Sequence, residues 1–198
     1  QLGAGVIKKI IKETGIDPQH IDEVIAGNVL SAGQKQGIAR QCAILGGVPE
    51  EKTAYSINMV CGSGMKAVMN AYSDIVAGFA SVVIAGGTES MTNAGFVLPA
   101  EIRGGFKMGN LQAADHMVTD GLTDAFNNYH MGITAENIAE QFGISREEQD
   151  AFAYLSQQKA IKAVDEDKFK DEIVPFEIVS REETIVFDKD EFPNRTST

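Results

Sequence analysis

The chain reads TAYSINMVCGSGMKAVMNAY over residues 53–72, and this stretch decides the fold. Residues 53–58 form a β-like run and residues 65–72 have the apolar spacing of a helix, so Cys61 is predicted near a helix N-terminus. The unpaired N–H groups and the dipole at a helix start favour a thiolate over a thiol. Gly62 and Gly64 leave the approach to the sulfur open for a bulky acyl donor. The turn therefore suits covalent catalysis, whereas the simpler interpretation is a buried cysteine in a strand-helix turn.

Helix and strand signals alternate over the first ninety or so residues. Helices are expected from Val6 to a stop at Gly15, from Gly37 to Leu45 and over residues 65–72; strands are expected at residues 23–26, 53–58 and 81–85. Such alternation predicts α/β layering with a mainly parallel sheet. The last strand ends in Gly-Gly, but the pattern GxGxxG does not occur in the sequence, so a dinucleotide site is a weak alternative.

The second half has a different character. Residues 103–109 (RGGFKMG) are rich in glycine and irregular, and strongly helical stretches follow. Ser145 and Glu148 have the spacing of a capping box at a helix start. Residues 171–179 then predict a strand of edge character, because Pro175 cannot donate a backbone hydrogen bond. We expect a largely helical insertion or cap on the α/β layer.

Composition narrows the class of protein. The 198 residues, 43% of them hydrophobic, suffice for the core of one large domain. A formal net charge of −11 argues against binding to nucleic acid or to an anionic membrane. The sequence has no apolar run of membrane-spanning length and opens without a signal-peptide pattern. Cys42 and Cys61 belong to no CxxC or Cys/His cluster, so we expect no metal site and a reducing, cytoplasmic location.

Four segments resemble the thiolase family, in the order in which that family has them. They are NMVCGSGMKAV at residues 58–68, VVIAGGTESM at residues 82–91, DGLTDAF running into YHMGITAEN at residues 120–137, and SREEQDAFA at residues 145–153. The resemblance covers essentially the whole chain and is closest to the bacterial biosynthetic members. It implies an N-terminal thiolase portion only, since the second half-domain of the family has no counterpart in this sequence.

The resemblance also implies a division of the chain. Residues 1–91 would be a layered αβα half-domain without its first strand. Residues 92–198 would be an incomplete loop domain that helps to bind coenzyme A and to assemble subunits. A chain of net negative charge needs a local basic patch for this polyanionic ligand, and Arg103 and Lys107 are weak candidates.

The chemistry that the resemblance implies begins at Cys61, which would attack the thioester of acetyl-CoA. A second acetyl-CoA would then take the acetyl group to give acetoacetyl-CoA, with the Cys61 N–H helping to hold the oxyanion. Leu122, His130 and Met131 match positions that contact the coenzyme and the acyl group. Met108 matches a loop used in tetramer assembly that reaches a neighbouring coenzyme site. Coenzyme A would thus be a substrate rather than a bound cofactor, and the complete enzyme a homotetramer.

Other polar residues have less specific signals. The family's activating histidine and second catalytic cysteine lie in C-terminal motifs that do not occur here, so this polypeptide alone is expected to be inactive. His20 and His116 match neither motif and are expected to be surface or hydrogen-bonded structural residues. Cys42 is expected in the core, and Glu89 as a structural polar residue near a subunit interface rather than a general base. A longer-chain 3-ketoacyl-CoA thiolase and a non-catalytic binding or assembly module stay open as alternatives.

Overall fold

The computed structural model describes residues 1–180 and 183–196 and shows the predicted α/β fold. The chain divides into two compact units, Gln1–His130 and Met131–Thr198. The predicted division after residue 91 follows the layout of the family and stays a prediction. Residues 181, 182, 197 and 198 of the predicted loop domain lie outside the described ranges.

The first unit contains the six helices and strands that were expected over the first ninety or so residues. They are α1 (Leu2–Thr14), β1 (Glu23–Gly27), α2 (Ile38–Gly46), β2 (Thr53–Ile57), α3 (Ser63–Val76) and β3 (Val83–Gly87). Gly15 ends α1 in the left-handed conformation, with φ of 66°, as the predicted stop requires. The unit also contains shorter elements. They are the 3-10 turns η1 (Pro18–His20), η2 (Met91–Asn93) and η3 (Ala100–Gly104), the paired strands β4 (Phe96–Val97) and β5 (Ala114–Asp115), and the π-helix η4 (Met117–Leu122).

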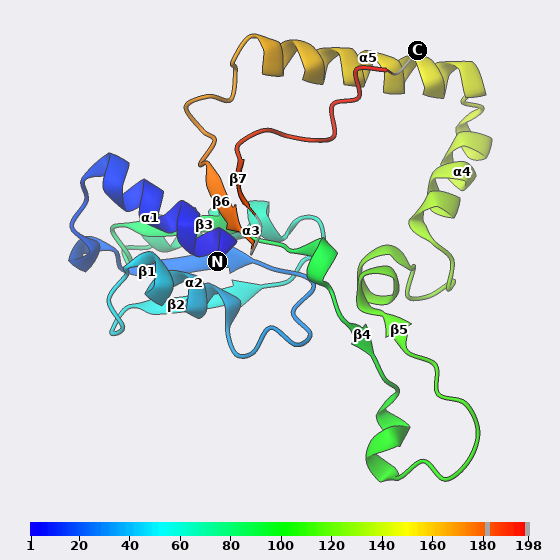
Figure 1. Cartoon of the computed structure of the whole chain (residues 1–198), viewed down its shortest axis with the longest axis horizontal. Helices are drawn as coiled ribbons and strands as arrows, with labels where there is room; N and C mark the ends of the chain where they lie inside the picture. The colour runs from blue at the N-terminus through cyan, green and yellow to red at the C-terminus, as the bar shows by residue number, and fades with distance from the viewer. Residues whose placement is uncertain (181–182, 197–198) are drawn as a thin grey trace. The chain divides into compact units, whose positions relative to one another are not determined.

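The sheet of the first unit is parallel, with β1 in the centre between β2 and β3 (Figure 1). Val24 of β1 is in register with Ala54 of β2 and with Ile84 of β3. The central strand is almost wholly buried, which explains its run of apolar residues. All three strands therefore end at the same edge of the sheet.

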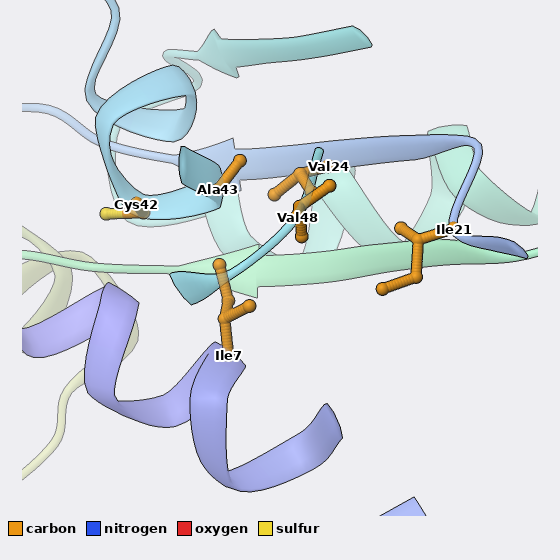
Figure 2. Packing of buried hydrophobic residues seen from close by; sticks show 6 residues of the cluster. All are labelled: Ile7, Ile21, Val24, Cys42, Ala43 and Val48. Carbon is orange, nitrogen blue, oxygen red and sulfur yellow. The ribbon is translucent and has the colours of Figure 1, made fainter. Parts of the chain in front are cut away.

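Successive residues of β1 face opposite sides of the sheet and build two separate cores. Val24 lies in a cluster with residues of α1, α2 and the neighbouring loops (Figure 2): Ile7, Ile21, Cys42, Ala43 and Val48. Ile25 instead packs against Ala67 and Ala71 of α3. Each buried aliphatic side chain of this size stabilises the fold by roughly 1.5–3 kcal/mol. Cys42 is a core residue as predicted, and burial raises the pKa of its thiol.

The face of α3 that does not contact the sheet is apolar and exposed. Its exposed side chains are Met65, Val68, Met69, Tyr72, Ile75 and Val76. Apolar side chains that gather on one exposed face are typical of interaction sites in soluble proteins, whereas single exposed apolar residues are common on any surface.

Among its described residues, the second unit has two helices and a pair of strands. Its elements are α4 (Met131–Phe142), α5 (Arg146–Asp165), β6 (Phe176–Val179) and β7 (Thr184–Phe187), with β6 and β7 antiparallel. The predicted capping box is present, since the Ser145 Oγ accepts the Glu148 N–H at 3.1 Å and the Ser145 N–H donates to Glu148 Oε2 at 2.8 Å. β7 was not anticipated from the sequence. Within the described residues, no helix is long and apolar enough to cross a membrane.

Candidate active site

A cavity lies where the strands of the parallel sheet end, within the first unit. Its volume is about 400 Å³, and it is lined by residues 27–30, Val60, Cys61, Ser63, Gly64, residues 87–89, Met91, Met117, Gly121 and Leu122. Ligand sites of open α/β sheets lie outside the carboxyl ends of the strands, and this cavity has that position. Its lining is mostly apolar, so it suits a ligand with an uncharged arm.

Cys61 belongs to a tight turn between β2 and α3 and is exposed. The residue before it, Val60, has φ of 48°, a left-handed conformation that costs a β-branched residue about 1–3 kcal/mol. Hydrogen bonds hold the turn in this state: the Val60 N–H donates to Asn58 Oδ1 at 2.9 Å, and the Gly62 N–H donates to the Met59 carbonyl at 3.1 Å. Strain held in this way fixes the Cys61 backbone beside the cavity.

Ser63, the first residue of α3, is buried and its side chain holds the same turn by hydrogen bonds. Its hydroxyl accepts the Met59 N–H at 2.9 Å and donates to the Val60 carbonyl at 2.6 Å. A Cβ on Gly27, the last residue of β1, would lie 2.5 Å from the Ser63 carbonyl carbon, so only glycine lets the helix start approach the strand end this closely. The predicted position of Cys61 near a helix start is confirmed, two residues before α3.

Gly62 and Gly64 follow Cys61 and differ in what surrounds them. A Cβ on Gly62 would lie 2.5 Å from the Met59 Cε, so Gly62 makes room for that side chain. Gly64 lies against the end of β3, where an added Cβ would be 3.8 Å from the Gly87 nitrogen. The contact at Gly64 is of ordinary length, so only Gly62 is tightly packed, and the open approach that both glycines are expected to give the sulfur stays a prediction.

Glu89 fixes the loop that follows β1. Its carboxylate accepts hydrogen bonds from the Asn28 side-chain Nδ2 at 3.0 Å and from the backbone N–H groups of Val29 and Leu30 at 2.8 and 3.1 Å. The Asn28 Nδ2 also donates to the Thr88 carbonyl at 3.0 Å, and its Oδ1 is buried without a partner in the described residues. A carboxylate occupied by three donors is structural, as predicted, and its expected place near a subunit interface stays a prediction.

The histidines differ in their surroundings. His20 is exposed, whereas His116 is 6% exposed and hydrogen-bonded at both ring nitrogens. The Ala32 N–H lies 3.4 Å from His116 Nε2, and His116 Nδ1 lies 2.6 Å from Asp120 Oδ2. His116 is thus a hydrogen-bonded residue of the first unit, as expected.

The structure brings one of the other predicted site residues to the Cys61 cavity. Leu122, the last residue of η4, lines it. Met108 is 91% exposed and does not line this cavity. His130 forms a bridge with Thr123 and ends the first unit, while Met131 begins α4 in the second. The positions of His130, Met131 and Met108 relative to a ligand stay predictions.

Several lining residues were missed by sequence reasoning. Asn28, Val29 and Leu30 follow the carboxyl end of β1, and Met117 comes from a π-helix. The rule that ligands bind at the carboxyl ends of parallel strands could have identified the first three. Across the described ranges, no group of three His, Cys, Asp or Glu side chains is arranged to hold a metal ion.

Comparisons with known proteins agree with this geometry. The family model described as the thiolase N-terminal domain matches residues 1–198. A probable acetyl-CoA acyltransferase of Staphylococcus aureus (strain COL) is 56% identical over 191 residues, which are 96% of this chain and 48% of that protein. An acetyl-CoA acetyltransferase of Syntrophomonas wolfei is 53% identical over 201 residues, which cover the whole chain and 50% of that protein.

Solved structures give the same result. The acetyl-CoA acetyltransferase of Bacillus anthracis superposes with a TM-score of 0.93 at 37% identity, over 98% of this chain and 49% of that one. A thiolase of Ascaris suum, solved in complex with coenzyme A, superposes with a TM-score of 0.88 at 39% identity, over 98% of this chain and 48% of that one. The chain therefore spans about half the length of the relatives that it matches.

Proposed function

This chain belongs to the thiolase family, and on that premise we propose that the full-length protein transfers acyl groups from coenzyme A thioesters through an acyl-cysteine at Cys61. The observation that carries the proposal is the exposed Cys61 thiol on a strained turn, beside an apolar cavity that Leu122 also lines. A thiol in this setting is accessible to an acyl donor, whereas the thiol of Cys42 is buried in the core.

The reaction would proceed in two steps. The Cys61 sulfur attacks the thioester carbonyl, a new carbon–sulfur bond forms, and coenzyme A leaves as its thiol. The α-carbon of a second acetyl-CoA, after losing a proton, attacks the acyl-enzyme; a carbon–carbon bond forms and the Cys61 sulfur leaves. The products are acetoacetyl-CoA and coenzyme A, and thiolysis is the reverse. The start of α3, two residues after Cys61, supports oxyanion stabilisation near the carbonyl.

The proton transfers need groups beyond these 198 residues. The residues that match the activating histidine and the second cysteine of the family do not occur in the sequence. We therefore expect the isolated polypeptide to be inactive. The full-length protein is expected to be cytoplasmic, to use coenzyme A only as part of its substrates, and to bind neither nucleic acid nor membranes.

The length of the acyl group and the assembly of subunits are the finer parts of the proposal. Met131 would limit the acyl group to short chains, and the glycine-rich loop of Met108 would join subunits of a tetramer. The exposed thioether of Met108 supports the second point, because an exposed apolar side chain on a loop suits a contact between subunits. A longer-chain 3-ketoacyl-CoA thiolase is the second candidate, supported by the broader name, acyltransferase, of the staphylococcal relative.

Steady-state kinetics of the full-length protein test the proposal. Thiolysis of acetoacetyl-CoA should disappear in Cys61→Ser and persist in Cys42→Ala, which removes the other thiol of these 198 residues at a position that does not line the cavity. Activity that survives Cys61→Ser in protein freed of contaminating thiolase would exclude Cys61 as the nucleophile. No activity in the unmodified protein, together with binding of acyl-CoA, would favour a non-catalytic module.

A further inference from the structure

The π-helix η4 forms a wall between two cavities of the first unit. Met117, Gly121 and Leu122 line the Cys61 cavity. His116, Thr119 and Asp120 line a second cavity of about 1040 Å³. The π-helical winding is rare and recurs at functional sites, because it turns side chains out of the register of an α-helix. The position of η4 therefore decides the shape of the Cys61 cavity.

His116 connects this wall to the loop after β1. Because the Ala32 N–H donates to its Nε2, that nitrogen carries the lone pair, and Nδ1 carries the proton and donates to Asp120. The ring thus has one assigned tautomer, set by the Ala32 N–H on one side and the Asp120 carboxylate on the other. The ring is 6% exposed, whereas the Asp120 side chain is 57% exposed, so water competes for the carboxylate but has little access to the ring.

The loop that His116 contacts is itself anchored. Glu89 accepts the N–H groups of Val29 and Leu30, as described above, so the loop is fixed to the end of β3. Leu30 is buried, and its Cδ2 lies 3.7 Å from the place of a Cβ on Gly121. One end of the loop is therefore held by Glu89, and His116 joins the other end to η4.

We propose that His116 is a positioning residue for the acyl-CoA site: through Ala32 and Asp120 it fixes η4, and with it Leu122, in the wall of the Cys61 cavity. The inference rests on the proposed function, because the ligand of that cavity is taken to be a coenzyme A thioester. His116 touches neither Cys61 nor the reacting atoms. It should act on binding more than on the chemical step.

The test uses four variants of the full-length protein at the proposed positions and one control variant. His116→Leu removes both ring nitrogens, whereas His116→Gln keeps an oxygen that can accept the Ala32 N–H. Asp120→Asn keeps an acceptor for Nδ1, and Asp120→Ala removes it. His20→Leu is the matched control, because it makes the same change at an exposed histidine outside the site.

Calorimetric Kd values for coenzyme A and steady-state kcat and KM are the main measurements. His116→Leu should weaken coenzyme A binding and raise KM by about tenfold, since it leaves the Ala32 N–H unpaired, while kcat changes by less than about threefold. His116→Gln should recover most of the affinity, and His20→Leu should match the unmodified protein. Equal Kd values for His116→Leu and the unmodified protein would overturn the proposal. It would also be overturned if His116→Gln bound coenzyme A no better than His116→Leu.

One further measurement separates this proposal from the proposed function. Amide hydrogen exchange over residues 117–122 needs no substrate, and it should be about tenfold faster in His116→Leu than in His20→Leu. Unchanged exchange would contradict the positioning role even if coenzyme A fails to bind the unmodified protein. If His116→Leu does not fold, the two Asp120 variants give the result. Weaker coenzyme A binding by Asp120→Ala than by Asp120→Asn supports the proposal, and equal binding contradicts it.

Discussion

Replacing Ser63 with alanine tests whether the strained turn before α3 holds Cys61 in place. The substitution removes one hydroxyl that accepts the Met59 N–H at 2.9 Å and donates to the Val60 carbonyl at 2.6 Å. The Val60 carbonyl keeps the Ser63 N–H at 3.1 Å as a donor, whereas the Met59 N–H loses its acceptor. The variant therefore leaves the Met59 N–H without its acceptor and keeps the other backbone hydrogen bonds of the turn.

The expected size of the effect follows from burial and strain. An unpaired buried N–H costs about 1–3 kcal/mol, and Met59 is 53% exposed, so water offsets part of this. Val60 stores about 1–3 kcal/mol in its left-handed backbone and should relax once the hydroxyl is gone. We expect Ser63→Ala to destabilise the turn by about 1–2 kcal/mol. Where this cost falls on the Cys61 geometry that the transition state needs, it corresponds to about a tenfold loss in kcat/KM.

Thermal unfolding and acetoacetyl-CoA thiolysis of the full-length protein measure this effect. Ser73→Ala is the matched control, because Ser73 lies on the same helix and its exposed hydroxyl donates to the Met69 carbonyl. Val60→Gly should restore activity to Ser63→Ala, since glycine adopts positive φ without strain. The reasoning is refuted if Ser63→Ala and Ser73→Ala have the same kcat/KM and the same melting temperature.

Three further predictions concern other parts of the chain. Limiting iodoacetamide should label Cys61 well before Cys42, because burial shields the second thiol and raises its pKa; peptide mapping that finds Cys42 labelled first would contradict this. The backbone N–H of Ser81, above all, holds the pKa of Asp22 below its usual 3.8, so its contribution to stability is present above that pH and is lost as pH falls through the lowered pKa. Melting temperatures of Asp22→Asn should accordingly fall less in acid than those of the unmodified protein, and parallel curves would exclude the effect. Met131→Ala should relax the selection against longer 3-ketoacyl-CoA chains by about 1–3 kcal/mol per methylene, and equal kcat/KM for both chain lengths in the unmodified protein would remove the short-chain assignment.

The core of the fold could be predicted because local signals and tertiary packing agree there. The alternating faces of β1 are encoded by consecutive apolar residues, and the capping box of Ser145 and Glu148 marks its helix start unambiguously. The family resemblance is confirmed by the match over the whole chain. Helix α3 begins at Ser63, two residues before the predicted run, since helix ends depend on caps that periodicity does not show.

The rest of the site depends on contacts between residues far apart in the sequence. Glu89 and Asn28 are 61 positions apart, and Ala32 and His116 are 84 apart, so neither pair has a local signal. The π-helical winding of η4 also has no periodicity that a sequence pattern could identify. Strand β7 was missed because a short strand followed by charged residues resembles a surface loop.

Trapping the acyl-enzyme tests the central claim most directly. Full-length protein is mixed briefly with acetyl-CoA, quenched in acid and digested. The mass of each cysteine-containing peptide is then measured by mass spectrometry. We predict that one acetyl group appears on the peptide containing Cys61 and that Cys42 stays unmodified. Incubation of the acetylated protein with free coenzyme A before the quench should remove the acetyl group as acetyl-CoA. An acetyl group on any other residue, or turnover without an acetyl group on Cys61, would contradict the account.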